Sequence, residues 1–139
     1  MREIKFRAWH KKIMYNVSTF GFNTSGIYSN MSFAHKGLGN DFMPEDDTCV
    51  SFDFSTIFMQ FTGREDAGIN GTEVWENDII ENCDTKDLQA VYWNENESAW
   101  FCRYIDQERN KDRIISLADS LGNLNKVVGN IHENANLLN

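Results

Sequence analysis

The chain opens with apolar and charged positions in alternation. Residues 3–9 read Glu-Ile-Lys-Phe-Arg-Ala-Trp, so the apolar residues 4, 6 and 8 share one face of an extended segment. A two-residue period is typical of a half-buried β-strand. After His10-Lys11-Lys12, residues 13–18 return as a second apolar segment. The pattern therefore predicts an N-terminal hairpin.

Further short strand patterns follow, separated by turn residues. They cover residues 49–54, 57–61, 73–75, 78–81, 88–93, 99–104 and 126–131. Gly71 can supply the positive φ of a turn, and Asn94-Glu-Asn-Glu-Ser98 is a strong turn signal. Residues 113–117 fit a strand or the start of a helical turn continuing to 121, and 135–138 fit a brief terminal turn. The pattern predicts a mainly β protein with few short helical turns: an N-terminal hairpin or sheet lobe, then a small barrel or roll.

Residues 19–47 differ from the rest of the chain. Four glycines and the single proline, Pro44, are mixed there with Asn, Ser and scattered apolar residues. A structureless loop of this length is uncommon in a compact domain. We expect this stretch to hold short irregular strands or to order against a partner subunit.

Composition supports a folded protein and limits its partners. The 139 residues are 41% hydrophobic and 13% aromatic, which is enough apolar material for a core and argues against disorder. The net charge is -8, a sign that disfavours nucleic-acid binding because phosphates require a positive surface. The charge is uneven, because residues 1–12 carry +4 and the remainder carries -12. The basic hairpin either packs beside an acidic part of its own or a neighbouring subunit, or forms a docking patch.

The sequence predicts a cytoplasmic protein without a membrane segment. The N-terminal residues lack the apolar centre of a signal peptide, and no run approaches the length of a membrane span. Cys49, Cys83 and Cys102 are odd in number and widely spaced. They fit free thiols in a reducing compartment better than disulfides.

Motifs for catalysis, cofactors and metals are missing from the sequence. His10, His35 and His132 lie outside any recognisable nucleophile motif, and no phosphate-binding glycine loop is present. The spacing of the cysteines does not fit zinc. We therefore predict no catalytic residues, no cofactor and no metal.

Acidic residues offer a weaker signal for chemistry. Asp53, Glu73 and Asp78 lie on or near strands and could form a carboxylate pair, but acids are so frequent that some pairs will be close by chance. The runs Glu45-Asp46-Asp47 and Glu65-Asp66 are interpreted as solvated loops, because neither has the ligand pattern of a calcium loop.

Aromatic residues are the better lead to function. By strand alternation, Tyr92 and Trp93 point to opposite faces, as do Trp100 and Phe101. One small core cannot use both faces, so one aromatic set is either covered by another lobe or subunit or exposed as a binding surface. The candidate interaction residues are Trp9, Tyr15, Trp75, Tyr92, Trp93 and Trp100.

Four blocks together resemble the YopX-like family of phage and prophage proteins. They are Met1-Arg-Glu-Ile-Lys-Phe-Arg-Ala-Trp9 with Lys12-Ile-Met-Tyr15, then Phe58-Met-Gln-Phe-Thr-Gly63 with Gly71-Thr-Glu-Val-Trp-Glu-Asn-Asp-Ile-Ile80, then Val91-Tyr-Trp93 with Trp100-Phe101, and last Val127-Val-Gly-Asn-Ile-His-Glu-Asn134. The family usually has Gly where this chain has Asn77. Because Asn tolerates the left-handed conformation, we expect the turn to survive.

The resemblance implies one domain over residues 1–139. Residues 1–57 would hold the N-terminal strands and the irregular insertion, and residues 58–139 a half like an SH3-type barrel. It also implies origin in a bacteriophage or prophage, but no assigned activity, and such barrels serve unrelated functions.

Three functions remain open from the sequence. The favoured one is a non-enzymatic phage accessory protein that self-associates and binds a host or phage protein. The second is a nucleic-acid-associated barrel, with Trp9 and Tyr15 on the basic hairpin supplying stacking. The third is an enzyme using carboxylates such as Asp53 or Asp78, which predicts a pocket with two acids of shifted pKa.

Overall fold

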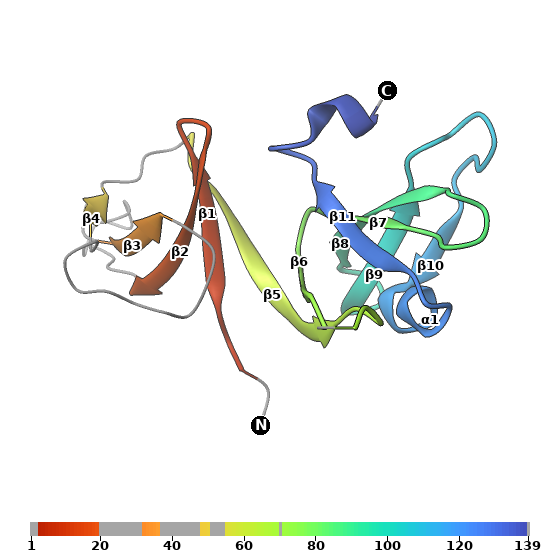
Figure 1. Ribbon diagram of the computed structural model, residues 1–139, viewed down its shortest axis with the longest axis horizontal. Helices are drawn as coiled ribbons and strands as arrows, with labels where there is room; N and C mark the ends of the chain where they lie inside the picture. Colours follow the sequence, from red (N-terminus) through yellow and green to blue (C-terminus); the bar gives the residue numbers. More distant parts are fainter. Residues whose placement is uncertain (1–2, 20–31, 37–47, 51–54, 70, 139) are drawn as a thin grey trace. The chain divides into compact units, whose positions relative to one another are not determined.

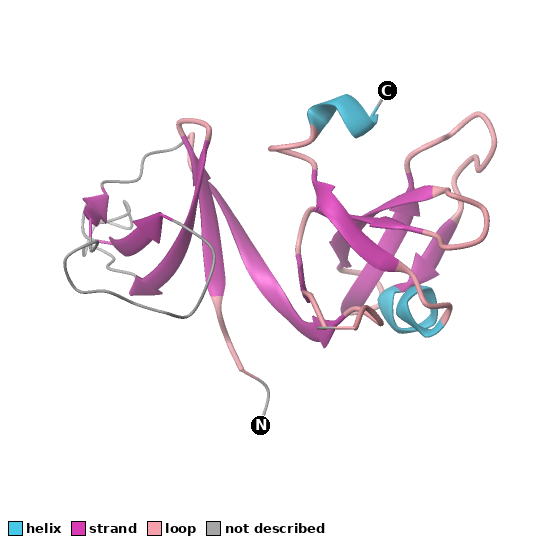
Figure 2. Cartoon of the chain, in the orientation of Figure 1, coloured by secondary structure: helices cyan, strands magenta, loops and turns pink. Residues whose placement is uncertain are grey.

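The computed structural model describes residues 3–19, 32–36, 48–50, 55–69 and 71–138 (Figure 1). The chain divides into two compact units, Glu3–Gln60 and Phe61–Asn139. Strands dominate both units and helices are short (Figure 2), which confirms the mainly β prediction. Each unit is described separately below.

The first unit is an antiparallel sheet. Its strands are β1 (Phe6–His10), β2 (Ile13–Thr19), β3 (Ser32–Lys36), β4 (Thr48–Val50) and the first part of β5 (Ile57–Glu65), in the order β4-β3-β2-β1-β5. The predicted hairpin is confirmed, with Phe6 opposite Val17 and His10 opposite Ile13. Ala8 is fully buried beneath Tyr15, Val17 and Phe58.

The β1–β2 turn has an unusual backbone for its sequence. Only Lys11 and Lys12 separate the two strands, and both have positive φ, 49° and 63°. Positive φ at both central residues defines the type I′ turn, whose twist matches that of the flanking strands. The favoured residues there are Asn and Gly, so two lysines adopt this conformation at a cost.

The predicted strand over 57–61 continues further than expected, to Glu65. Glu65, which the sequence places in a solvated loop, is thus the last residue of a strand. Gly63 adopts a φ of 83°, and the register with β6 (Glu73–Trp75) shifts between Phe61 and Arg64. This bulge turns the end of β5 so that its polar residues still pair with β6 in the second unit.

The second unit is built on a five-stranded antiparallel sheet with the order β10-β9-β8-β7-β11. The strands are β7 (Asp78–Glu81), β8 (Leu88–Asn94), β9 (Ala99–Tyr104), β10 (Ile114–Ser116) and β11 (Lys126–Asn130), accompanied by α1 (Leu117–Gly122) and the 3-10 turn η2 (Ala135–Leu138). The segment 113–121 is thus a strand followed by a helix. Ser116 caps that helix by accepting from the Asp119 N–H.

Alternation along these strands places one side-chain set in a common core. Its buried members are Val74, Ile80, Val91, Cys102, Leu117 and Leu121, and Trp100, Ile115 and Val127 pack against them. Val91 lies directly opposite Cys102 in the β8–β9 pair. The core therefore joins one face of the sheet to helix α1.

Three further predictions concern the turns at Gly71 and Asn77, the stretch 19–47 and the strand over 49–54. Gly71 and Asn77 have positive φ, 55° and 68°, which confirms both predicted turns. Within 19–47 the structure describes Thr19, at the end of β2, and the strand β3; the other residues of that stretch lie outside the described residues. Of the strand predicted over 49–54, residues 49 and 50 are in β4, and 51–54 lie outside the described residues.

Candidate interaction surface

The β8–β9 hairpin positions the aromatic residues singled out in the sequence. Its four-residue turn is held by Asn94, whose Oδ1 accepts from the N–H groups of Asn96 and Glu97 at 3.1 and 3.2 Å. Ser98 completes the turn with a φ of 50°. An Asn side chain that accepts two successive backbone donors fixes the hairpin register from within.

Trp93 and Trp100 form a cross-strand pair at the end of this hairpin. They are direct partners in the register, with ring centroids 5.1 Å apart and planes inclined at 74°. Edge-to-face geometry of this kind is favourable beyond the area buried. Trp100 packs against the core, whereas Trp93 is 40% exposed. One ring thus anchors a partner that presents its surface to solvent.

Two acidic side chains accompany this pair. Glu95 and Glu97 are exposed in the turn that follows Trp93. Neither forms an ion pair with any residue that the structure describes. We call Trp93, Glu95, Glu97 and Trp100 the tryptophan patch.

The opposite face of the hairpin carries a second aromatic pair. Tyr92 lies opposite Phe101, and both are half-buried. The guanidinium of Arg103 stacks over the Tyr92 ring at 4.9 Å from its centroid. The alternation argument thus places the two aromatic sets correctly, and an arginine of the same sheet covers part of the second.

The remaining candidate residues lie on strands other than β8 and β9. Trp75 is only 8% exposed and its ring lies 5.4 Å from that of Phe61, so it belongs to the interior. Trp9 pairs with Met14 and Tyr15 with Ala8, which puts Trp9 and Tyr15 on opposite faces of the hairpin. They therefore do not form a shared stacking platform.

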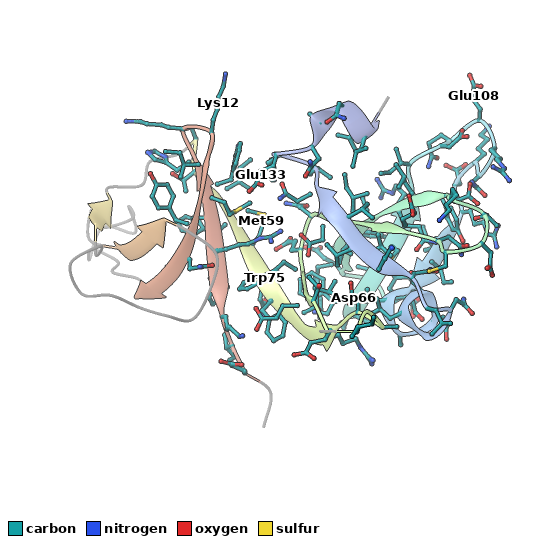
Figure 3. The ribbon with its side chains drawn as sticks, viewed as in Figure 1. Lys12, Met59, Asp66, Trp75, Glu108 and Glu133 are labelled. Atoms are coloured by element: carbon teal, nitrogen blue, oxygen red, sulfur yellow. The ribbon has the colours of Figure 1, made fainter. Side chains whose placement is uncertain are left out.

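Asp66 corrects the interpretation of Glu65-Asp66 as a solvated loop. Asp66, labelled in Figure 3, is buried, and its Oδ1 accepts from the N–H groups of Gly68 and Thr72 at 3.0 Å each. Its Oδ2 accepts from the N–H of Val127 at 2.9 Å. Burial, the largest single influence, raises the pKa of Asp66, but these hydrogen bonds and the charge of Lys126 together lower the pKa below its ordinary value. The carboxylate is a structural link to β11.

Of the other candidate carboxylates, Glu73 on β6 lies directly opposite Glu65 of β5. Asp78 is buried and accepts from the Trp75 N–H at 2.8 Å, so it supports the β6–β7 turn. Asp53 lies outside the described residues. In the described segments no three His, Cys, Asp or Glu side chains are grouped as metal ligands, and no helix is long and apolar enough to cross a membrane.

A buried polar network surrounds the Cys102 thiol. The Ser120 hydroxyl donates to Gln89 Oε1 at 2.6 Å and accepts from Asn125 Nδ2 at 3.2 Å. Burial raises the pKa of Cys102 to about 12, an effect that Ser120 partly opposes. A thiol with such a pKa stays protonated near neutral pH. Cys102 beside Ser120 is therefore suited to packing rather than to nucleophilic chemistry.

Asn77 is the point where three of the sequence blocks meet. Its N–H donates to the Val91 carbonyl at 2.9 Å, its carbonyl accepts from the Ile131 N–H at 3.0 Å, and its side-chain nitrogen lies 3.3 Å from His132 Nε2. His132 is half-buried. The turn after β6 is therefore fixed both to β8 and to the closing segment, residues 129–134.

The closing segment has structural reasons for its polar residues. Asn130 Oδ1 accepts from the N–H groups of His132 and Glu133, and Asn134 Oδ1 accepts from the Asn130 N–H. A side chain at Gly129 would meet Asn134, because a Cβ there would lie 2.3 Å from its Oδ1. The block Gly129-Asn-Ile-His-Glu-Asn134 is thus a self-capped turn.

The pattern of these blocks extends to nearly the whole chain. A family model described as YopX protein matches residues 5–139. The chain belongs to the YopX family. A search of curated proteins found no significant match. In this YopX-family protein, the matched blocks described above serve mainly to hold turns and strands together.

Asp66 is the important residue that sequence reasoning missed. Its signal was present, since an Asp two residues before a Gly is the pattern of a side chain that accepts from the backbone N–H of the next turn. The link to Val127 spans 61 residues, and no local pattern indicates it.

Proposed function

We propose that this YopX-family protein is a non-enzymatic accessory protein of a bacteriophage or prophage that acts in the cytoplasm by binding another protein. The exposed Trp93 ring, anchored on Trp100, is the observation that carries this proposal. Tryptophan is enriched among the residues that dominate the energy of protein interfaces. A ring held by its neighbour also loses little conformational freedom on binding.

Two carboxylates and one thiol of the second unit support the same proposal. Asp66 and Asp78 accept backbone hydrogen bonds, and Cys102 is buried with a raised pKa. These groups already serve the fold. Turnover of a defined substrate that is abolished by one side-chain change would contradict the non-enzymatic assignment.

The test is capture of a partner by immobilised full-length protein from a bacterial host lysate, with and without nuclease. Trp93→Ser removes the exposed ring. Ile114→Ser is the matched control, because Ile114 is 44% exposed but lies opposite Arg103, on the other face of the sheet. Wild-type protein and the control should retain a stoichiometric, nuclease-resistant protein that Trp93→Ser loses.

Two results would contradict the proposal. Equal capture by all three forms would mean that Trp93 does not contact the partner. Recovery of nuclease-sensitive material alone would favour the second candidate, nucleic-acid association, whose support is the exposed lysine pair at the β1–β2 turn.

A further inference from the structure

The tryptophan patch has the chemistry to bind a lysine side chain. An ammonium group is attracted to the face of a tryptophan ring, and carboxylates beside the ring add a charge interaction. Trp93 offers the exposed ring, while Glu95 and Glu97 lie in the turn directly after it. Because neither acid has an ion-pair partner among the described residues, both are available to a cation.

The β1–β2 turn presents two lysines of the kind this patch fits. We call Lys11 and Lys12 the lysine turn; both are exposed, and Figure 3 shows the Lys12 side chain extending from the tip of the hairpin. Neither forms an ion pair with a described residue. Residues held in an unfavourable backbone conformation often mark a functional site. Asn-Gly would suit this turn better, so a role for the charges explains the lysines.

The geometry points to a specific occupant: the tryptophan patch binds the lysine turn of a second copy of this chain. This inference rests on the proposed function and names a partner for the same surface. The charge distribution favours it, since residues 61–139 contain seven Lys or Arg against 15 Asp or Glu and so carry the whole net charge of -8. Residues 1–12 carry +4. The two surfaces attract each other between copies.

The contact is heterologous, because the surface offered by one copy differs from the surface that receives it. Each copy has one lysine turn and one tryptophan patch, so copies add head to tail and form a ring or a chain. The attraction involves exposed charges and is therefore weak and screened by salt. Association should rise with protein concentration and fall between about 50 mM and about 500 mM salt.

Sedimentation velocity over a range of concentrations tests the pairing. Lys11→Glu/Lys12→Glu and Glu95→Lys/Glu97→Lys should each weaken association about tenfold or more, because each places like charges opposite one another. Lys86→Glu/Lys111→Glu is the control: it makes the same charge change at other exposed lysines, and Lys86 also has a positive φ of 63°. This control should associate as the wild type does. All substituted positions are exposed, and thermal unfolding checks that each variant is folded.

Mixing the two defective variants provides the decisive measurement. In the mixture, the acidic turn of the Lys11→Glu/Lys12→Glu variant can bind the basic patch of the Glu95→Lys/Glu97→Lys variant. Association should therefore return to near the wild-type level. A wild-type chain that stays monomeric at every concentration overturns the inference. Variants that associate like the wild type, or a mixture that does not recover, overturn it as well.

The outcome is separable from that of the proposed function. If Trp93→Ser abolishes capture of a host protein while the lysine variants leave self-association unchanged, the protein-binding proposal stands and the second copy is excluded as the occupant. If self-association depends on both surfaces but no other protein is captured, the tryptophan patch serves assembly.

Discussion

Short polar side chains in the second unit act as partners for backbone groups. Asp66, Asp78 and Asn130 each accept from at least one backbone N–H, and Asn77 adopts a left-handed conformation at a tight turn. Such residues fix the path of loops that lack a regular hydrogen-bond ladder. Their identities are therefore set by geometry, and a change of one atom in the side chain has a defined consequence.

Asp66→Asn tests this at a single residue. Asn keeps one acceptor oxygen for Gly68 and Thr72 but turns an N–H group toward the N–H of Val127, where Asp66 Oδ2 now accepts. We expect a loss of about 1–3 kcal/mol in the free energy of unfolding at pH 7, measured by urea denaturation. Asp84→Asn, which removes the same charge from an exposed turn, should change it by less than about 0.5 kcal/mol.

The pH dependence of the free energy of unfolding provides a second comparison of wild type and Asp66→Asn. The pKa of Asp66 is lower in the folded protein than its ordinary value of 3.8. The stabilisation by its charge is therefore fully present above about pH 4 and is lost as the pH falls through the lower, folded-state pKa. The difference between wild type and Asp66→Asn should shrink on acidification toward about pH 3. A difference that is constant with pH would mean that the charge is not what matters.

At the scale of elements, strands and turns followed from local patterns and their pairing did not. Alternation predicted β1, short runs rich in aromatic residues predicted β8 and β9, and the Asn94–Ser98 segment predicted the turn between these two, because such signals lie in adjacent residues. The extension of β5 depends on a bulge at Gly63 and on pairing with β6. Those features arise from contacts distant in sequence, which a periodicity does not contain.

The same limit applies to the candidate interaction residues. Alternation placed Tyr92 and Trp93 on opposite faces, as the register shows. It could not tell that Trp75 packs on Phe61 or that Trp93 remains exposed at the hairpin end. Exposure depends on which elements cover each face, and that is a property of the assembled unit.

The β1–β2 turn allows a prediction about one element. Lys11→Asn/Lys12→Gly replaces two residues at φ 49° and 63° with those preferred in a type I′ turn. We expect the free energy of unfolding to rise by about 1 kcal/mol, because the left-handed conformation costs less for Asn and Gly. Urea denaturation measures this, and Lys11→Glu/Lys12→Glu should leave stability nearly unchanged. If Asn-Gly gave no gain, backbone strain would no longer argue for a role of the lysines.

At the scale of the whole molecule, the distribution of charge limits the partners. Residues 1–60 contain six Lys or Arg and six Asp or Glu, so the net charge of -8 comes entirely from residues 61–139. A phosphate backbone would be attracted to the lysine turn and repelled by most of the remaining surface. The lysine turn is therefore better suited to bind an acidic protein surface than to bind DNA.

Fluorescence anisotropy with labelled single- and double-stranded DNA at about 50 mM salt tests this balance. We expect no saturable binding at protein concentrations up to about 0.1 mM, the weak end of nonspecific DNA affinities. The physical reason is twofold: the net charge is negative, and Trp9 and Tyr15 lie on opposite faces of the hairpin, so bases cannot stack on both along one strand. Binding that falls steeply with salt and disappears in Lys11→Glu/Lys12→Glu would reverse the order of the two candidate functions, because the lysine turn would then be serving phosphates.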